Sequence, residues 1–495
     1  MKKRLFTPLL LLFSVAIFAQ QPGIFEASAD AGLSAVKGKT SYDPRTQNYR
    51  LSGAGSGALN GSYHLAWKAV EGNFLLQARA VFSDKEGPDT QQLGWLVRSS
   101  DAEKPAMVCA MVLGSGKTSL LVRRTQGGPV EEVIAPVSHP DVIQLEKRDD
   151  QFILSVAKFG ETFQSVAAGE VLLEGPLQAG IFVASGDAKQ AAGAAFDNVR
   201  IVLPPGKGFI PYEDYLGSYI ETMEVSTGNR EIVFADPESV QAPNWTLDGK
   251  ALLYNKKGLI YRLDLDRKQA AVIPTDTVRD NNNDHVISFD GTMLGLSSSS
   301  GEEAYGSLVY TVPIGGGIPR RITPLGPSYL HGWSPDGNWL TYTGLRNGDY
   351  DIYIIPSGGG EEIRLTDAPG LDDGSEYSPD GKWIYFNSVR TGSMEIWRMR
   401  PDGSGQEQLT RDAFQNWFPH VSPDGKWVVF LSYLPEVKAD DHPFYKQVYL
   451  RLMPAEGGSP RTIAYLYGGQ GTINTPSWSP DGKRIAFVSN SGGVK

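Results

Sequence analysis

A short turn motif recurs six times in this chain and constrains its fold more than any other feature. One copy reads Trp333-Ser334-Pro335-Asp336-Gly337, and the aspartates of successive copies are 42, 46, 44, 44 and 57 residues apart. Proline presets the backbone of a tight turn, and glycine adopts the conformation that a Cβ would disfavour. Short apolar runs typical of strands follow the copies. A period of about 40–50 residues is typical of β-propellers. We therefore expect six four-stranded blades, whose turn aspartates are Asp248, Asp290, Asp336, Asp380, Asp424 and Asp481.

The ends of this repeat region predict how the ring closes. The last turn motif is followed by one strand, 484–488, before the sequence given ends. Two further strands, 219–225 and 230–235, come before the first complete repeat. Joining these segments into the sixth blade removes the sheet edges that an open ring would expose. We expect the propeller to span 219–495.

Composition limits the classes of function. The 495 residues carry a formal net charge of −10, and no basic run occurs, which argues against nucleic acid as a partner. Residues 1–19 have the pattern of a secretory signal peptide: three basic residues, an apolar run and a small residue. That run is too short to span a bilayer. We expect a cleaved signal and a periplasmic or secreted bacterial protein.

Residues 22–202 contain no copy of the turn motif and show short alternating strands separated by turns, which predicts an all-β sandwich. Its sequence resembles the concanavalin A-like lectin/glucanase superfamily in the runs 63–67, 72–74, 94–98, 180–183 and 196–201. The resemblance implies a jelly-roll sandwich and, more weakly, sugar binding. Two prolines and two glycines in 203–208 predict a linker, 203–218, between the domains.

The repeats themselves resemble TolB-type, WD40-like (PD40) propeller repeats. The resemblance is carried by the turn motif, by the strand Asp351-Ile352-Tyr353 and by the Leu-Thr pairs at 365–366 and 409–410. It implies a periplasmic six-bladed propeller. TolB itself carries a small α/β domain before its propeller, whereas a β-sandwich is expected here, so a Tol–Pal envelope role does not follow from the resemblance. Function depends on sites rather than on folds.

Chemically active side chains gather just before the turn motif, where the innermost strand of each blade begins. Three of the six histidines, His285, His331 and His420, lie four or five residues before a turn aspartate, and Glu376 supplies a carboxylate at the same level. Slightly further out we expect ligand-binding residues at the channel mouth. These candidates are Asn283, Asp373, Trp417 and Asn474.

Two interpretations of the histidines stay open. They either cap backbone groups and line a polar channel, or, with Glu376, they bind a divalent metal. The metal would be manganese or zinc, or calcium if oxygen ligands such as those of 280–284 contribute. The one-residue offset between His331 and His420 weakens the metal interpretation unless a β-bulge intervenes. Oligogalacturonate lyases, which also have TolB-like repeats, hold a channel metal mainly through histidines, and the resemblance implies β-elimination of uronates as one activity.

We therefore expect an exported all-β protein that binds a carbohydrate or a cell-envelope protein at the propeller mouth without catalysis. The alternative is a metal-dependent polysaccharide lyase or another sugar-active enzyme. The arrangement of the histidines discriminates these hypotheses, because metal ligands must converge on one point.

Overall fold

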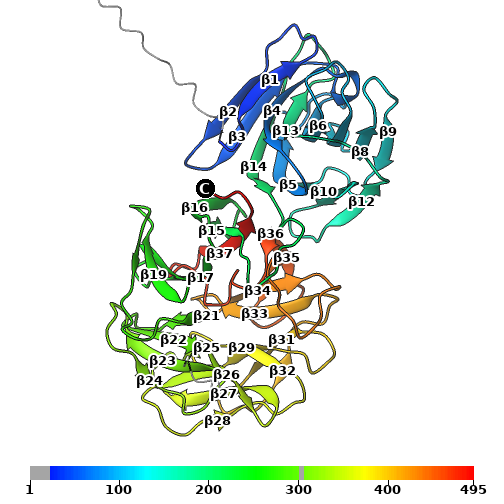
Figure 1. The fold of residues 1–495 in the computed structure, drawn as a ribbon. Helices are drawn as coiled ribbons and strands as arrows, with labels where there is room; N and C mark the ends of the chain where they lie inside the picture. The colour runs from blue at the N-terminus through cyan, green and yellow to red at the C-terminus, as the bar shows by residue number, and fades with distance from the viewer. Residues whose placement is uncertain (1–22, 300, 302–305) are drawn as a thin grey trace, which may run out of the picture.

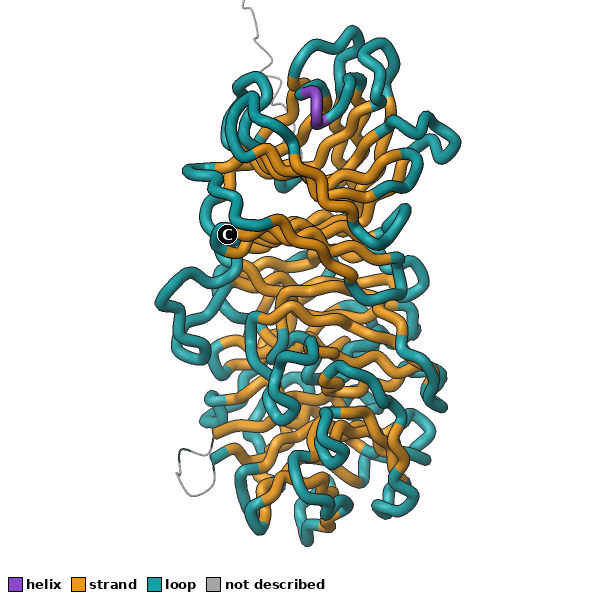
Figure 2. Tube along the Cα trace, turned by 90° about the vertical axis from the view of Figure 1, so that its right-hand side faces the viewer, coloured by secondary structure: helices purple, strands orange, loops and turns teal. Residues whose placement is uncertain are grey.

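The computed structural model describes residues 23–299, 301 and 306–495, which form two all-β lobes. Figure 1 shows the N-terminal lobe above a β-propeller, and Figure 2 shows the same elongated arrangement after a quarter turn. The predicted signal peptide, 1–19, lies outside the described residues. No helix in the described part of the chain is long and apolar enough to cross a membrane.

The N-terminal lobe is a sandwich of two seven-stranded antiparallel sheets, with one short 3₁₀-helix, Ala58–Asn60. One sheet has the order β1 (Ala27–Ala31), β4 (Tyr63–Val70), β13 (Leu177–Ala184), β6 (Gln92–Arg98), β7 (Met107–Leu113), β8 (Thr118–Arg123) and β9 (Glu131–Ile134). The other has the order β12 (Gln164–Ala168), β11 (Gln151–Ala157), β10 (Val142–Arg148), β5 (Phe74–Phe82), β14 (Ala192–Val202), β3 (Asn48–Gly53) and β2 (Lys39–Asp43).

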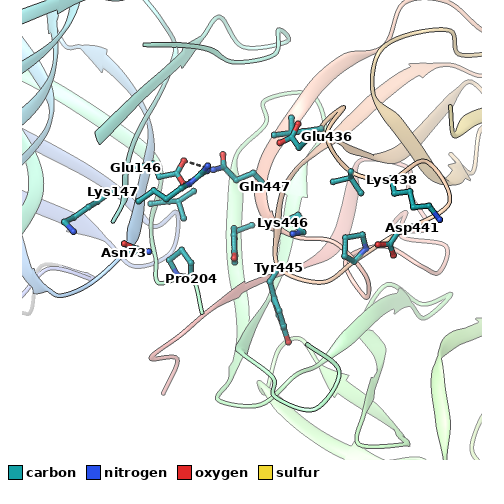
Figure 3. A pocket seen from close by; sticks show the side chains of 16 residues that line it. Asn73, Glu146, Lys147, Pro204, Glu436, Lys438, Asp441, Tyr445, Lys446 and Gln447 are labelled. Atoms are coloured by element: carbon teal, nitrogen blue, oxygen red, sulfur yellow. Dashed lines mark hydrogen bonds and ion pairs between the residues drawn. The ribbon is translucent and has the colours of Figure 1, made fainter. Parts of the chain in front are cut away.

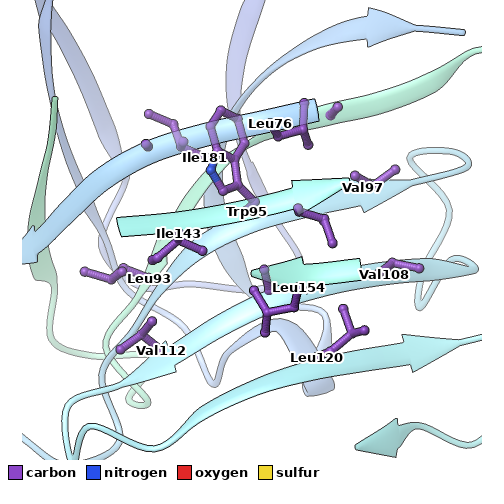
Figure 4. Packing of buried hydrophobic residues seen from close by; sticks show 14 of the residues in the cluster. Leu76, Leu93, Trp95, Val97, Val108, Val112, Leu120, Ile143, Leu154 and Ile181 are labelled. Atoms are coloured by element: carbon purple, nitrogen blue, oxygen red, sulfur yellow. The ribbon is translucent and has the colours of Figure 1, made fainter. Parts of the chain in front are cut away.

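The inner faces of the two sheets form one hydrophobic core. Alternate residues of β6, such as Trp95 and Val97, pack against Leu76 of β5 and Leu154 of β11 from the opposite sheet (Figure 4). Side chains two residues apart on a strand share a face, so alternation of this kind fills the space between two sheets. Burying such side chains stabilises the fold by about 1.5–3 kcal/mol for each large residue.

The C-terminal lobe is a propeller with six blades, as the repeat predicts. Five blades are four-stranded: β17–β20 (Gln241–Trp245, Ala251–Lys256, Leu259–Asp264, Gln269–Val272), β21–β24 (Asn281–Ile287, Met293–Ser299, Ser307–Pro313, Arg320–Arg321), β25–β28 (Ser328–Trp333, Trp339–Arg346, Asp349–Pro356, Ile363–Arg364), β29–β32 (Asp372–Tyr377, Ile384–Ser388, Glu395–Met399, Glu407–Gln408) and β33–β36 (Gln415–Val421, Trp427–Tyr433, Lys446–Pro454, Arg461–Gly468).

The sixth blade joins the two ends of the propeller. Strand β37 (Arg484–Ser491) pairs with β15 (Gly217–Glu224), which pairs with β16 (Arg230–Asp236). A bridge between Trp478 and Ile485 adds the innermost position. The predicted closure by strands from both ends is therefore confirmed.

Each turn motif forms the hairpin between the first two strands of its blade. At 334–339, Gly337 has a φ of 72° and donates its N–H to the Ser334 carbonyl. The Ser334 hydroxyl donates to Asp336, and the same hydroxyl oxygen accepts the N–H of Trp339. The hydrogen bond from Ser334, together with one from the Asn338 N–H, lowers the pKa of the Asp336 carboxyl. The motif is thus a self-contained turn, and its repetition sets the register of the blades.

The sandwich and the propeller share a buried, charged contact. Glu221 of β15 is fully buried and lies 2.6 Å from both Arg200 of β14 and Arg230 of β16. Burial opposes its ionisation, but the two guanidinium groups lower the pKa of Glu221 to about 2. Arg230 also donates to Gln77 of the sandwich over 3.3 Å. Because an unpaired buried charge is costly, this cluster fixes the orientation of the two lobes.

Candidate functional site

A β-bulge interrupts the first strand of each four-stranded blade and separates two sets of side chains. The register shifts between Gln241 and Asn244, and equivalent shifts occur in β21, β25, β29 and β33. In three blades the residue six positions before the turn aspartate has a positive φ, namely Ala242, Gly374 and Phe418. A bulge changes which way the following side chains face. A bulge was the condition under which His331 and His420 could face the same way despite their one-residue offset in the repeat.

Residues at the bulge and just before it line a polar cavity at the channel mouth. Its volume is about 510 Å³, within the range of small-molecule sites. It contains Asn283, Asp373 and Asn474, three of the four residues predicted to bind a ligand. The full lining is Asn282, Asn283, Asp284, Tyr329, His331, Thr343, Tyr350, Leu371, Asp373, Phe418, Asp440, His442, Gln470 and Asn474.

Trp417, the fourth predicted ligand residue, does not reach this cavity. Its side chain is fully buried in the hydrophobic core of the last complete blade. The ring of His442 packs edge-on against it, with 4.6 Å between ring centroids. His442 comes from the long loop 434–445 between β34 and β35, which covers the tryptophan. The prediction that Trp417 stacks on a ligand is corrected: it is a core residue.

Three titratable groups, those of Asp284, His331 and Asp373, lie close to one another in the mouth cavity. His331 Nε2 lies 2.9 Å from Asp373 Oδ1, which also accepts the Thr343 hydroxyl over 2.7 Å. Burial opposes ionisation of Asp373, but His331, His442 and the Thr343 hydrogen bond lower its pKa to about 2. Burial opposes protonation of His331, but Asp373 and Asp284 raise its pKa.

The pKa of Asp284 is shifted in the opposite direction to that of Asp373. Burial, assisted by the negative charge of Asp373, raises the pKa of Asp284 to about 7. The positive charge of His331 only partly offsets this effect. The cavity therefore holds one carboxylate that is ionised throughout the physiological range and another that exchanges a proton within it. Carboxyl groups with separated pKa values are a frequent feature of acid–base sites.

The four predicted metal ligands do not lie together. His285 is fully buried in β21, and burial lowers its pKa to about 4, so its ring is neutral at pH 7. His331 lines the mouth, whereas Glu376 lines the opposite, turn-side end of the channel. Within 23–299, 301 and 306–495, no group of three or more His, Cys, Asp or Glu residues is placed to hold a metal ion. The metal site gains no support from this geometry and stays a prediction.

Glu376 and His420 instead form a bridge between neighbouring blades. Glu376 Oε2 lies 2.5 Å from His420 Nδ1, and Glu376 Oε1 accepts the N–H of Val421 over 3.0 Å. The other imidazole nitrogen contacts the carbonyl of Ile473. Both nitrogens of His420 are therefore used within the fold. This agrees with the alternative in which channel histidines satisfy internal polar groups.

Several lining residues were absent from the predicted ligand set. Tyr329 occupies the same blade position as Asn283, Asp373 and Asn474, seven residues before its turn aspartate, so the repeat register alone would have indicated it. Tyr350 is the second residue of β27 and pairs with Leu345 of β26. His442 and Asp440 come from the loop 434–445, whose only sequence signal is the long final step of 57 residues.

The turn-side end of the channel is narrower and largely apolar. Its cavity, about 230 Å³, is lined by the tryptophans at 245, 333 and 478 and by three prolines of the turn motifs, Pro379, Pro423 and Pro480. The indole of Trp333 donates to the Val286 carbonyl of the preceding blade, and the indole of Trp478 donates to the His420 carbonyl, both over 3.0 Å. These tryptophans hold adjacent blades together.

A second polar hollow, of about 490 Å³, lies between the two lobes (Figure 3). Gln447 of β35 bridges it, since its amide donates to Glu146 of the sandwich over 2.8 Å. Lysines and carboxylates line it together, among them Lys147, Lys438, Glu436 and Asp441. Its mixed charges show no preference for one class of ligand.

Comparisons with known proteins identify relatives of the propeller. A profile of the TolB β-propeller domain matches residues 330–440. An uncharacterized protein of Agrobacterium fabrum is 47% identical over 272 residues, which make up 55% of this chain and 92% of that protein.

One solved structure gives the same result. The structure of a TolB-like protein from Agrobacterium tumefaciens is 46% identical, with a TM-score of 0.54, and the match covers 56% of this chain and 99% of that chain. TolB from Acinetobacter baumannii is 17% identical, with a TM-score of 0.41, over 66% of this chain and 80% of that chain.

Proposed function

This chain belongs to the TolB-like β-propeller family, and we propose that it is an exported binding protein that holds a carbohydrate in the polar cavity at its channel mouth. The observation that carries the proposal is the lining of that 510 Å³ cavity. Four side-chain amides, those of Asn282, Asn283, Gln470 and Asn474, surround it together with two tyrosines. An amide both donates and accepts hydrogen bonds, as a sugar hydroxyl does, and tyrosine adds an apolar face with a polar tip.

A small concave site favours a sugar over the cell-envelope protein that the sequence left as an alternative. Most protein interfaces are broad, with a buried centre depleted in charge, whereas this cavity contains Asp284, His331 and Asp373. Binding of a polypeptide instead of a glycan is an outcome of the test below, and it would count against the proposal.

The proposal also covers the fold type of the N-terminal sandwich and the cellular location of the protein. Two packed seven-stranded antiparallel sheets support a concanavalin-like jelly roll as the type of the N-terminal lobe. The signal pattern in 1–19 supports export to the periplasm or beyond the cell. Together these features suit a protein that meets polysaccharides outside the cytoplasm.

A sugar-active enzyme is the second candidate, and one observation favours it. Asp284 and Asp373 have pKa values of about 7 and about 2 in one cavity, with His331 beside them. A proton donor and an ionised group that orients a histidine are elements of general acid–base catalysis. This candidate needs no metal, unlike the lyase that the sequence suggested.

A glycan array followed by calorimetry tests the binding function. We expect the mature protein to bind at least one oligosaccharide series, and Asn283→Ala to weaken that binding about three- to tenfold through the loss of a ligand hydrogen bond. Asn338→Ala is the matched control, because Asn338 is an exposed asparagine on a turn at the opposite end. Equal weakening by both variants, or no glycan binding by the wild type, would sink the proposal.

A further inference from the structure

Another hollow, distinct from the one between the lobes, adjoins the mouth cavity. This neighbouring hollow has a volume of about 580 Å³, and Asn282, Asn283 and Gln470 line both. The same amide groups therefore lie where the two spaces adjoin, and we treat the two together as one groove across the mouth face. We call this combined space the mouth groove. A monosaccharide fills only part of it.

Aromatic rings lie at the far end of the mouth groove. Tyr212 and Tyr215 come from the segment between the two lobes and are 55% and 47% exposed. Both pack edge-on against the buried Phe444, with centroid separations of 5.1 and 6.0 Å. Phe444 belongs to the loop 434–445, which also supplies His442 to the mouth cavity. One loop thus supports both ends of the groove.

The backbone at Tyr212 is held in an unfavourable conformation. Its φ is 72°, which is rare for a bulky residue and costs of the order of 1–3 kcal/mol. Internal bonds maintain it: the Tyr215 hydroxyl donates to the Tyr212 carbonyl over 3.0 Å, and Ile210 donates its N–H to the Asp214 side chain. Burial of Tyr212 does not account for this strain, because the residue is 55% exposed. A strained, exposed aromatic residue beside a polar groove indicates a ligand contact.

The charges of the mouth groove select among sugars. At the far end Glu238 pairs with Lys257, and in the loop Asp440 pairs with Lys438. The remaining lining carboxyl groups include Asp280, Asp373, which pairs with His331, and Asp284, which is only partly ionised at neutral pH because burial raises its pKa to about 7. An acidic lining repels polyanionic chains, because like charges across an interface cost free energy. Neutral sugars suit this lining better than uronates do.

We propose that the mouth groove binds a neutral oligosaccharide, with one sugar residue in the mouth cavity and a later residue stacked on the exposed rings of Tyr212 and Tyr215. This inference rests on the proposed carbohydrate-binding function and names its ligand class. It assigns a subsite to the segment that joins the sandwich to the propeller. The amides of Asn282, Asn283 and Gln470 hydrogen-bond the chain between the two ends.

The test is the dependence of affinity on chain length. A glycan array that contains neutral cello- and chito-oligosaccharides together with oligogalacturonides identifies the preferred series. Calorimetry then measures that series from one to six sugar residues. We expect a neutral series to be preferred, and the affinity to rise with length until the chain reaches the tyrosines. Tyr212→Ala and Tyr215→Ala should each weaken binding of the longer chains roughly three- to tenfold, and leave binding of the shortest ligand unchanged.

Matched variants separate stacking from folding. Tyr212→Phe keeps the ring and should retain the affinity, and Ile210→Ala removes an exposed side chain of the same segment without removing a ring. Affinity that does not depend on chain length, or a preference for oligogalacturonides, would overturn the groove proposal while leaving sugar binding at the mouth intact. A protein that binds no glycan on the array would overturn both.

Discussion

The two ends of the propeller channel are built from the same six repeats, yet they differ in chemistry. At the turn-side end, tryptophans occupy the same position in three blades, and two of them, Trp333 and Trp478, donate a hydrogen bond to the preceding blade. At the mouth, the position seven residues before the turn aspartate varies from blade to blade: Asn283, Tyr329, Asp373 and Asn474 all occupy it and line the cavity. The turn-side position repeats because it packs between blades, whereas the mouth position varies because it faces the cavity in four blades and is buried, as Trp417, in another.

The β-bulge makes this division possible. Without the bulge, side chains on one strand would alternate regularly between its two faces. The residues that pack at the turn-side end would then also determine which residues of the strand face the mouth. With the shift, as at Leu330 and Gly332, the turn-side register is kept while His331 reaches the mouth cavity. Substitutions at the turn-side end should therefore reduce stability, whereas substitutions at the mouth should change protonation or binding.

The largest expected effect is on the packing of the turn-side end. Trp333→Ala removes a buried indole and its hydrogen bond to Val286, and should lower the free energy of unfolding by about 3–5 kcal/mol. Urea unfolding followed by circular dichroism measures this. Trp427→Ala is the control, because Trp427 is 38% exposed and should lose much less. Equal losses in the two variants would show that the tryptophan position does not hold the blades together.

The bridge between Glu376 and His420 should have the next largest effect. Glu376→Ala leaves the Val421 N–H and a His420 nitrogen without their partner, which should cost about 3 kcal/mol. Glu376→Gln keeps an acceptor and should lose less. The same urea experiment applies. A Glu376→Ala protein with wild-type stability would show that this carboxylate is available for another role, including the metal ligation suggested by the sequence.

The fold was predictable because its signals are local and repeated. Turn chemistry marked each blade, and the strands left over at the two ends indicated the closure of the ring, so β15, β16 and β37 could be expected in one sheet. The sandwich followed from alternation in segments such as 74–80. Sequence did not reveal how the lobes dock, because Glu221, Arg200 and Arg230 meet only after folding and carry no local pattern.

The site was predictable only in part. Position relative to the turn identified Asn283, Asp373 and Asn474, since the register is repeated in each blade. It misplaced Trp417, because burial at this position depends on a loop that comes later in the chain. Sequence position also could not show how the bulge, which the sequence left open as a possibility, turns residues that lie one or two positions apart toward different ends of the channel. Side-chain direction, rather than spacing, decided these cases.

The difference between the two ends of the channel can also be tested by changing the pH, through the carboxyl groups that line the mouth. The folded pKa of Asp284, about 7, lies above its ordinary value of 3.8, so the folded state binds the extra proton between these values. Its contribution to stability is complete below about pH 4 and is lost as the pH rises through 7. Asp284→Asn should therefore raise the free energy of unfolding at pH 8, by on the order of 2 kcal/mol, with a smaller gain at pH 4.5.

The Asp284→Asn comparison needs a control of opposite sign. Asp373 has a folded pKa of about 2, below its ordinary value, so its contribution is present above about pH 4 and is lost as the pH falls through 2. Asp373→Asn should therefore lower stability at pH 8. Urea midpoints of both variants at pH 4.5 and 8 give the comparison. If both variants shift in the same direction at pH 8, the two carboxyl groups do not have opposite environments.

The smallest expected effect is on metal content. His331 and His420 belong to separate polar pairs, one with Asp373 at the mouth and one with Glu376 toward the turn side. We therefore expect elemental analysis of the mature protein, after exposure to manganese and zinc, to find no stoichiometric metal. The variant with both His331→Ala and His420→Ala should be indistinguishable from the wild type in this measurement. One equivalent of metal in the wild type that is lost in the variant would contradict the separation of the two ends, because a shared ion requires both histidines to converge. That result would favour the metal-dependent lyase over the binding protein.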